Sequence, residues 1–224
     1  MTARGPFATA ALAVRALDEI RSAIALGTRF GRVADGVAAP VRVAGLAWLP
    51  IVGMLVGGTA AVVAWLVAGW SPLGAAAAAV VVLDLLGGRP LGPASAVKAA
   101  ALALVPPGAR WVPLVLAPVL GRWAQTVQSY GGGRPAGEPA GESKAQFREF
   151  GWASVVALGT ALALLDAVGL LAGLATALTT VGMRVVFARR RGGMPASGPA
   201  ATATLVEVVV MGVLAALAPL AVSR

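Results

Sequence analysis

Two side chains on which much enzyme chemistry depends are missing from this sequence, which contains no cysteine and no histidine. The absence of cysteine excludes disulfide bonds and thiolate nucleophiles, and the absence of histidine excludes imidazole as an acid, a base or a metal ligand. Charged residues are also scarce, at 12% of the chain, and only 9 residues are acidic. Any catalysis must therefore use carboxylates, arginines, hydroxyl groups or a bound ion.

The chain is instead rich in apolar residues. They make up 58% of its 224 residues and give a mean hydropathy of +0.85, which leaves too little polar surface to cover a water-soluble globule. A helix that crosses a membrane needs roughly 20 mostly apolar residues. The stretches long enough for this are residues 43–69, 111–128, 151–187 and 202–222. The composition therefore predicts a polytopic membrane protein.

Shorter apolar stretches complete the predicted fold. Residues 72–86 form a further span, 94–105 form a thin crossing or a re-entrant piece, and 151–187 are long enough for a hairpin of two spans with Asp166 at its turn. We expect an all-α bundle of about six or seven transmembrane helices, organised as one integral membrane domain over residues 1–224. Seven crossings place the basic loops on the cytoplasmic side, as the positive-inside rule requires. The expected location is the cell (inner or plasma) membrane.

Two segments outside the spans have different characters. Residues 1–42 contain apolar residues from Phe7 to Leu26 that recur mostly every three or four positions, with arginines between them, which predicts an amphipathic helix on the membrane surface. A secretory signal fits less well, because charged residues follow the first short apolar run at once. Residues 130–150 are rich in glycine and proline and are expected to form a flexible or partly ordered polar loop.

The formal charge of +9 does not indicate a nucleic-acid partner. The arginines are scattered over the segments that flank the apolar stretches and form no single basic face with interleaved aromatic residues. We therefore expect membrane lipid, and no nucleic acid, among the partners.

Three acidic residues, Asp84, Asp166 and Glu207, lie within the long apolar stretches. A charged side chain in hydrocarbon is costly, so an intramembrane acid is by default a functional-site hypothesis. The structural alternative is that Asp84 pairs with Arg89, Asp166 marks a turn and Glu207 pairs with a nearby arginine. Carboxyl groups more than about 8 Å apart could not chelate one divalent ion, because its oxygen ligands lie at roughly 2.0–2.6 Å.

Three ordered blocks resemble the cobalamin synthase family, the adenosylcobinamide-GDP ribazoletransferases. Residues 48–57, with the spacing Pro-x-x-Gly-x-x-x-Gly and with Thr28-Arg29 before them, are similar to that family's opening. Residues 117–124, which contain Arg122, are similar to its arginine-bearing helix. The segment from Arg189 to Glu207 resembles its Gly-Gly-x-Thr-Gly-Asp-x-x-Gly-Ala-x-x-Glu-x-x-Glu pattern, of which Glu207 keeps the last glutamate.

The acidic signature of that family has no counterpart here. In the family, His-Leu-Asp-Gly-Leu-Ala-Asp-x-x-Asp-Gly follows a Gly-Gly pair. Aligning residues 87–88 with that pair places Gly92, Ala96 and Ala99 at the three aspartate positions. The family's reaction is a phosphoryl transfer, in which magnesium held on carboxylates usually neutralises the developing charge. The resemblance therefore implies Mg²⁺, whereas the missing aspartates remove ligands for it.

The resemblance implies an enzyme that joins adenosylcobinamide-GDP and α-ribazole, or its phosphate, to form cobalamin, or its phosphate, with release of GMP. Arg29 and Arg122 would contact the substrate phosphates, and Glu207 would be a metal or orienting ligand. The corrinoid and ribazole substrates and protein partners of cobalamin assembly are the implied partners. The missing acids support a second hypothesis, a catalytically inactive relative that acts as a membrane scaffold or partner subunit. A small-molecule transporter is a third.

Overall fold

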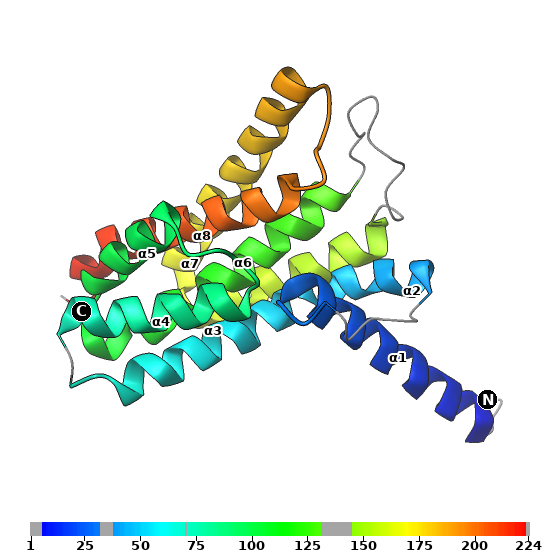
Figure 1. Cartoon of the computed structure of the whole chain (residues 1–224), viewed down its shortest axis with the longest axis horizontal. Coiled ribbons are helices and arrows are strands. Elements are labelled where there is room, and N and C mark those ends of the chain that lie inside the picture. The colour runs from blue at the N-terminus through cyan, green and yellow to red at the C-terminus, as the bar shows by residue number, and fades with distance from the viewer. Residues whose placement is uncertain (1–5, 32–37, 70, 131–144, 223–224) are drawn as a thin grey trace.

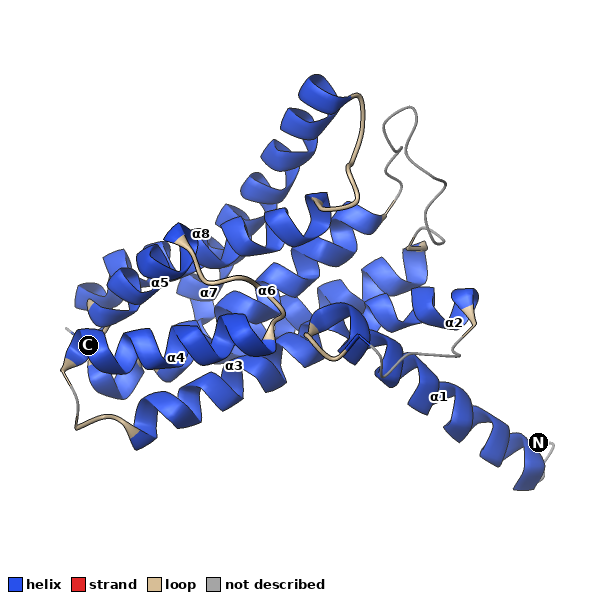
Figure 2. Cartoon of the chain, in the orientation of Figure 1, coloured by secondary structure: helices blue, strands red, loops and turns tan. Residues whose placement is uncertain are grey.

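The computed structural model describes residues 6–31, 38–69, 71–130 and 145–222, and within these ranges all regular structure is helical (Figures 1 and 2). The helices are α1 (Pro6–Gly27), α2 (Ala39–Ala44), the 3-10 helix η2 (Gly45–Trp48), α3 (Leu49–Leu66), α4 (Pro72–Leu86), α5 (Pro93–Ala103), the 3-10 helix η3 (Pro107–Ala109), α6 (Trp111–Ser129), α7 (Phe147–Arg191) and α8 (Gly198–Val222). The predicted all-α class is confirmed. The helix α7 begins inside the segment predicted as the 130–150 loop, most of which lies outside the described residues.

Several of these helices are long and apolar enough to cross a membrane. By length and composition the described residues contain three, Gly45–Leu66, Phe147–Arg191 and Gly198–Ala218, or four if the pair formed by α5 and α6 is one span. That pair is bent by 118°, and α5 folds back against α4 and α8, which fits both the thin crossing and the re-entrant piece expected for residues 94–105. The chain is a membrane protein. Six or seven crossings would require α4, which is shorter than a usual span, to cross the membrane and α7 to count as two spans. The predicted number of crossings therefore stays a prediction.

The division of α7 occurs at Asp166. This residue has φ 45° and ψ −123°, which is not helical, and it is the one described residue other than glycine with positive φ. A Cβ atom added to Gly169 would collide with the carbonyl group of Ala161, which shows that the two arms, residues 147–165 and 167–191, turn sharply against each other. The side chain of Asp166 is exposed. The predicted turn at Asp166 is confirmed.

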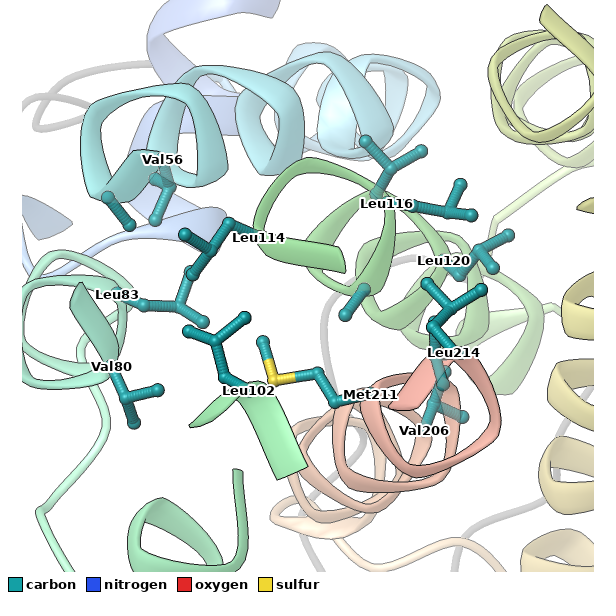
Figure 3. Close-up of a cluster of buried hydrophobic side chains, with 14 of the residues drawn as sticks. Val56, Val80, Leu83, Leu102, Leu114, Leu116, Leu120, Val206, Met211 and Leu214 are labelled. Atoms are coloured by element: carbon teal, nitrogen blue, oxygen red, sulfur yellow. The ribbon is translucent and has the colours of Figure 1, made fainter. Parts of the chain in front are cut away.

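The core of the bundle forms around α6, which packs against α3, α7 and α8. Figure 3 shows apolar side chains from five helices meeting at one place, among them Val56, Leu83, Leu102, Leu114 and Met211. These residues come from α3, α4, α5, α6 and α8 in turn. The small helix α5 is therefore part of the core, and its register relative to α4 and α8 is fixed by packing.

The first span contacts α6 through glycines. A Cβ added to Gly53 would lie 2.6 Å from the carbonyl oxygen of Pro118, and one added to Gly57 would collide with the backbone of Leu114. Small residues let two helix backbones approach closely within a membrane. Gly53 and Gly57 thus allow close packing of α3 against α6.

Replacing Gly57 with leucine is expected to destabilise the bundle by about 1–3 kcal/mol, since overpacking forces helices apart. Gly58→Leu is the matched control, because a Cβ added at Gly58 meets nothing within 4 Å. The measurement is the thermal unfolding midpoint of each protein purified in detergent. Equal midpoints for the two variants would contradict the close approach of α3 and α6.

The predicted N-terminal helix is present as α1, which extends away from the bundle in Figure 1. Its end nearest the bundle is anchored, since Ala23 is fully buried and Gly45 of η2 lies directly against it. Val14 and Leu17 are more than half exposed. Placement of this apolar surface on lipid stays a prediction.

Candidate functional site

Five charged side chains from four helices and one turn converge inside the bundle. They are Asp84 on α4, Arg89 in the turn that follows it, Lys98 on α5, Arg122 on α6 and Glu207 on α8. All five are buried or nearly so: Lys98 has no exposed surface, and Arg89, the most accessible, has a side chain 10% exposed. We call these five residues the charged cluster. Charges so deeply buried require partners, because their desolvation is costly.

Lys98 is the link between the two acids of the cluster. Its Nζ donates hydrogen bonds to Oδ1 of Asp84 and, over 3.3 Å, to Oε2 of Glu207. The same Oε2 atom accepts a hydrogen bond from Nη1 of Arg89. One lysine and one arginine thus tie α4, α5 and α8 together.

Arg122 approaches the cluster from α6. Its Nη2 donates to the carbonyl oxygen of Gly87 over 3.2 Å, and its Nη1 donates to Oε1 of Gln125 over 3.0 Å. Arg89 and Glu207 are the charged groups whose fields act on it. Arg122 therefore holds the end of α4 in place and adds a third positive charge to the cluster.

Glycines make this convergence possible. Gly121 faces α8, where an added Cβ would lie 3.0 Å from Cγ and 3.1 Å from Oε1 of Glu207. Gly88 has φ +70°, a conformation that side chains rarely adopt. It lies against Arg29, whose backbone N–H donates to the carbonyl oxygen of Leu86 over 3.1 Å. The segment after α1 is thus fastened to the turn that leads into Arg89.

Three buried polar atoms of the cluster have no hydrogen-bond partner among the described residues. They are Oδ2 of Asp84, Nη2 of Arg89 and Nε of Arg122. Buried polar atoms are usually satisfied, so an unsatisfied group calls for an explanation such as a bound ligand. Three cations also face two carboxylates, which leaves the cluster with one net positive charge. An anion would satisfy both the free donors and the excess charge.

The structure brings together some of the residues singled out in the sequence and separates others. Asp84, Arg122 and Glu207 belong to the cluster, whereas Asp166 lies exposed at the bend of α7. Arg29 touches the neighbouring turn through its backbone, and its side chain is exposed. The roles of Arg29 and Arg122 toward phosphate and of Glu207 toward metal stay predictions.

One pairing expected from the sequence is wrong. Asp84 does not pair with the side chain of Arg89: its carboxylate binds Lys98, and Arg89 binds Glu207 instead. Arg89 was expected to pair with Asp84, the acid nearest to it in sequence. The turn at Gly88 directs the Arg89 side chain toward Glu207 on α8 instead. Glu207 does pair with an arginine, as expected, but this arginine is Arg89, which lies 118 positions away in the chain.

Lys98 was not among the site residues predicted from the sequence, although it lies in the apolar stretch of residues 94–105. The available signal was its setting, a single charge in a short alanine-rich helix, Pro93–Ala103. A lone lysine among alanines either lies at an interface or must be neutralised inside the protein. Here the second case holds.

The chemistry of the cluster does not suit a divalent cation. No group of three acidic side chains capable of holding a metal occurs in the described ranges. The two carboxylates that do meet are both bound to Lys98, and Arg89 also occupies Glu207. A divalent ion prefers several oxygen ligands, and three neighbouring cations would repel it.

Part of the chain matches a known protein family. Residues 91–215 fit the family described as cobalamin-5-phosphate synthase. The matched range covers more than half of the chain and includes Lys98, Arg122 and Glu207. Comparisons with curated proteins and with solved structures give no match. The family resemblance found in the sequence is confirmed.

Proposed function

The chain belongs to the cobalamin-5-phosphate synthase family, and this membership supports a transferase role in cobalamin synthesis; from this premise we propose the reaction that it performs. It joins adenosylcobinamide-GDP and α-ribazole, or ribazole phosphate, at the surface of the cell's plasma membrane. A hydroxyl oxygen of ribazole forms a bond to the phosphorus that bears the cobinamide group. The bond from that phosphorus to the bridging oxygen breaks, and GMP leaves with this oxygen.

The observation that carries the proposal is the charged cluster with its net positive charge and two unpartnered guanidinium nitrogens. Phosphoryl transfer depends mainly on positioning and on stabilising charge that develops on phosphate oxygens. Arg89 and Arg122 would bind the non-bridging oxygens through the Nη2 and Nε atoms that have no partner. Lys98, buried between Asp84 and Glu207, adds positive charge at close range.

Asp84 supplies the complementary function of a hydrogen-bond acceptor. Its Oδ1 is held by Lys98, and its Oδ2 is buried without a partner. The attacking ribazole hydroxyl would donate to Oδ2 and release its proton there as the new bond to phosphorus forms. Glu207 acts through others, since it orients Arg89 and Lys98.

The test is reconstitution of the purified protein in lipid vesicles with adenosylcobinamide-GDP and α-ribazole, once with Mg²⁺ and once with a chelator. Product and GMP should appear in equal amounts above a vesicle blank. Arg122→Ala is expected to lower the rate by roughly 10²–10³-fold, the usual effect of removing one preorganised donor. Arg184→Ala is the control, because Arg184 is bound to the carbonyl oxygen of Tyr130 away from the cluster. Absence of product under both conditions would overturn the proposal.

A second candidate, a noncatalytic scaffold or partner subunit of cobalamin assembly, is favoured by the internal pairing of the cluster. Asp84, Arg89, Lys98 and Glu207 already neutralise one another in part, as purely structural ion pairs do. The deciding experiment is complementation of a deletion strain. Rescue of corrinoid assembly by the wild type and equally by Arg122→Ala would support the scaffold.

A further inference from the structure

The cations of the cluster outnumber its acids at a place where the family resemblance implies a metal. Gly92, Ala96 and Ala99, aligned with the family's aspartates, lie at or within α5, the same helix that carries Lys98. The carboxylates near α5 come from α4 and α8, and Lys98 holds both. The positive charge next to these acids is thus supplied by a side chain of the protein itself.

We propose that this site binds the phosphate groups of its ligand through Arg89, Lys98 and Arg122, with no divalent cation. The inference rests on the proposed function for the identity of the natural ligand, a nucleoside diphosphate ester. The binding of a diphosphate anion does not depend on the proposed function, because it is inferred only from the positions and unpartnered atoms of the cluster's cations. The protein's own cations do the neutralising that a metal ion does in most phosphoryl-transfer sites.

The burial of the three cations supports this assignment. Lys98 is fully buried, Arg122 is 4% exposed, and the side chain of Arg89 is 10% exposed. At such depth water screens charges poorly, so a net positive charge attracts an anion more strongly than an exposed cluster does. Each guanidinium also keeps one unpartnered nitrogen, Nη2 of Arg89 and Nε of Arg122, for a charge-assisted hydrogen bond to a phosphate oxygen.

The turn that carries Arg89 is the least buried part of the cluster. Arg89 lies in the turn between α4 and α5, beside the exposed residues Gly88 and Pro90. It is the most accessible of the three cations, and its Nη2 atom is unpartnered. Arg89 is therefore the cation of the cluster nearest to the exposed turn, and Lys98 and Arg122 are buried more deeply.

The probe is inorganic pyrophosphate, and the measurement is its dissociation constant for the whole protein in detergent, with EDTA present throughout. The wild type should bind under these conditions. Arg89→Gln is expected to weaken binding about tenfold or more, as loss of a charge-assisted hydrogen bond does. Arg110→Gln is the matched control, because Arg110 is also a largely buried guanidinium, and it donates to the carbonyl oxygens of Val105 and Ala103, outside the cluster.

The outcomes separate this inference from the proposed reaction. Pyrophosphate binding in EDTA that Arg89→Gln weakens and Arg110→Gln leaves unchanged supports the metal-free site, even if no ribazole is transferred. Binding that appears only after Mg²⁺ is added at the same free pyrophosphate concentration overturns it. An equal loss in both variants, or no binding by the wild type in either condition, also overturns it. Circular dichroism of each variant verifies that the helices are intact.

Discussion

Lys98→Met is expected to destabilise the folded protein by about 3–5 kcal/mol, the cost of leaving buried charges without their partner. The substitution removes the one ammonium group that Asp84 and Glu207 share. Asp84 is left with no described cation in contact, whereas Glu207 keeps Arg89. The measurement is the unfolding midpoint in detergent, and Val97→Met, a half-exposed position on the same helix, is the control. Equal midpoints would show that Lys98 is not buried between the two acids.

The double variant Asp84→Asn with Lys98→Met separates stability from function. Removing both members of a buried ion pair is usually far less costly than removing one, so most of the lost stability should return. The rate of ribazole transfer should not return, because both the acceptor and the inner cation are gone. Recovery of stability and transfer together would mean that this pair is only structural.

The helical framework was largely predictable because it depends on local properties of the chain. The length of an apolar run determines whether a helix can span the membrane. The spacing of Gly53 and Gly57 determines how closely one adjacent helix can pack, and the break at Asp166 bends its own helix. Composition therefore predicts an all-α membrane bundle, and the local sequence, with Pro72 at one end and Gly87-Gly88 at the other, predicts the boundaries of α4.

The site was predictable only in part, because it depends on which helices meet. Glu207 and Arg122 stood out by their rarity in apolar stretches, but no pattern in the sequence joins α8 to Arg89, which lies 118 positions away. The choice of partner follows from Gly88, whose positive φ redirects the chain, and from Gly121, whose missing side chain admits Glu207. Sequence separation is a poor guide to pairing in such a bundle.

Glu207→Gln is expected to have two opposite effects. It removes one of two negative charges and leaves three cations facing Asp84 alone. In phosphate-free buffer the folded state should lose about 3–5 kcal/mol, since breaking a buried pair leaves uncompensated charge. Pyrophosphate should then stabilise the variant more than the wild type, because a ligand that binds only the folded state stabilises it according to its affinity and the added net charge raises that affinity.

Glu149→Gln is the matched control for this prediction. Glu149 is also buried, but it caps α7 by accepting from the N–H of Gln146 over 3.0 Å and pairs with Arg148. Its loss should lower the unfolding midpoint without any added response to pyrophosphate. The prediction fails if pyrophosphate raises the unfolding midpoint of Glu207→Gln no more than that of the wild type, or if it raises the midpoints of both variants equally. Either result would mean that the excess positive charge of the cluster does not attract the anion. A larger rise confined to Glu207→Gln would locate the bound anion beside Arg89, Lys98 and Arg122.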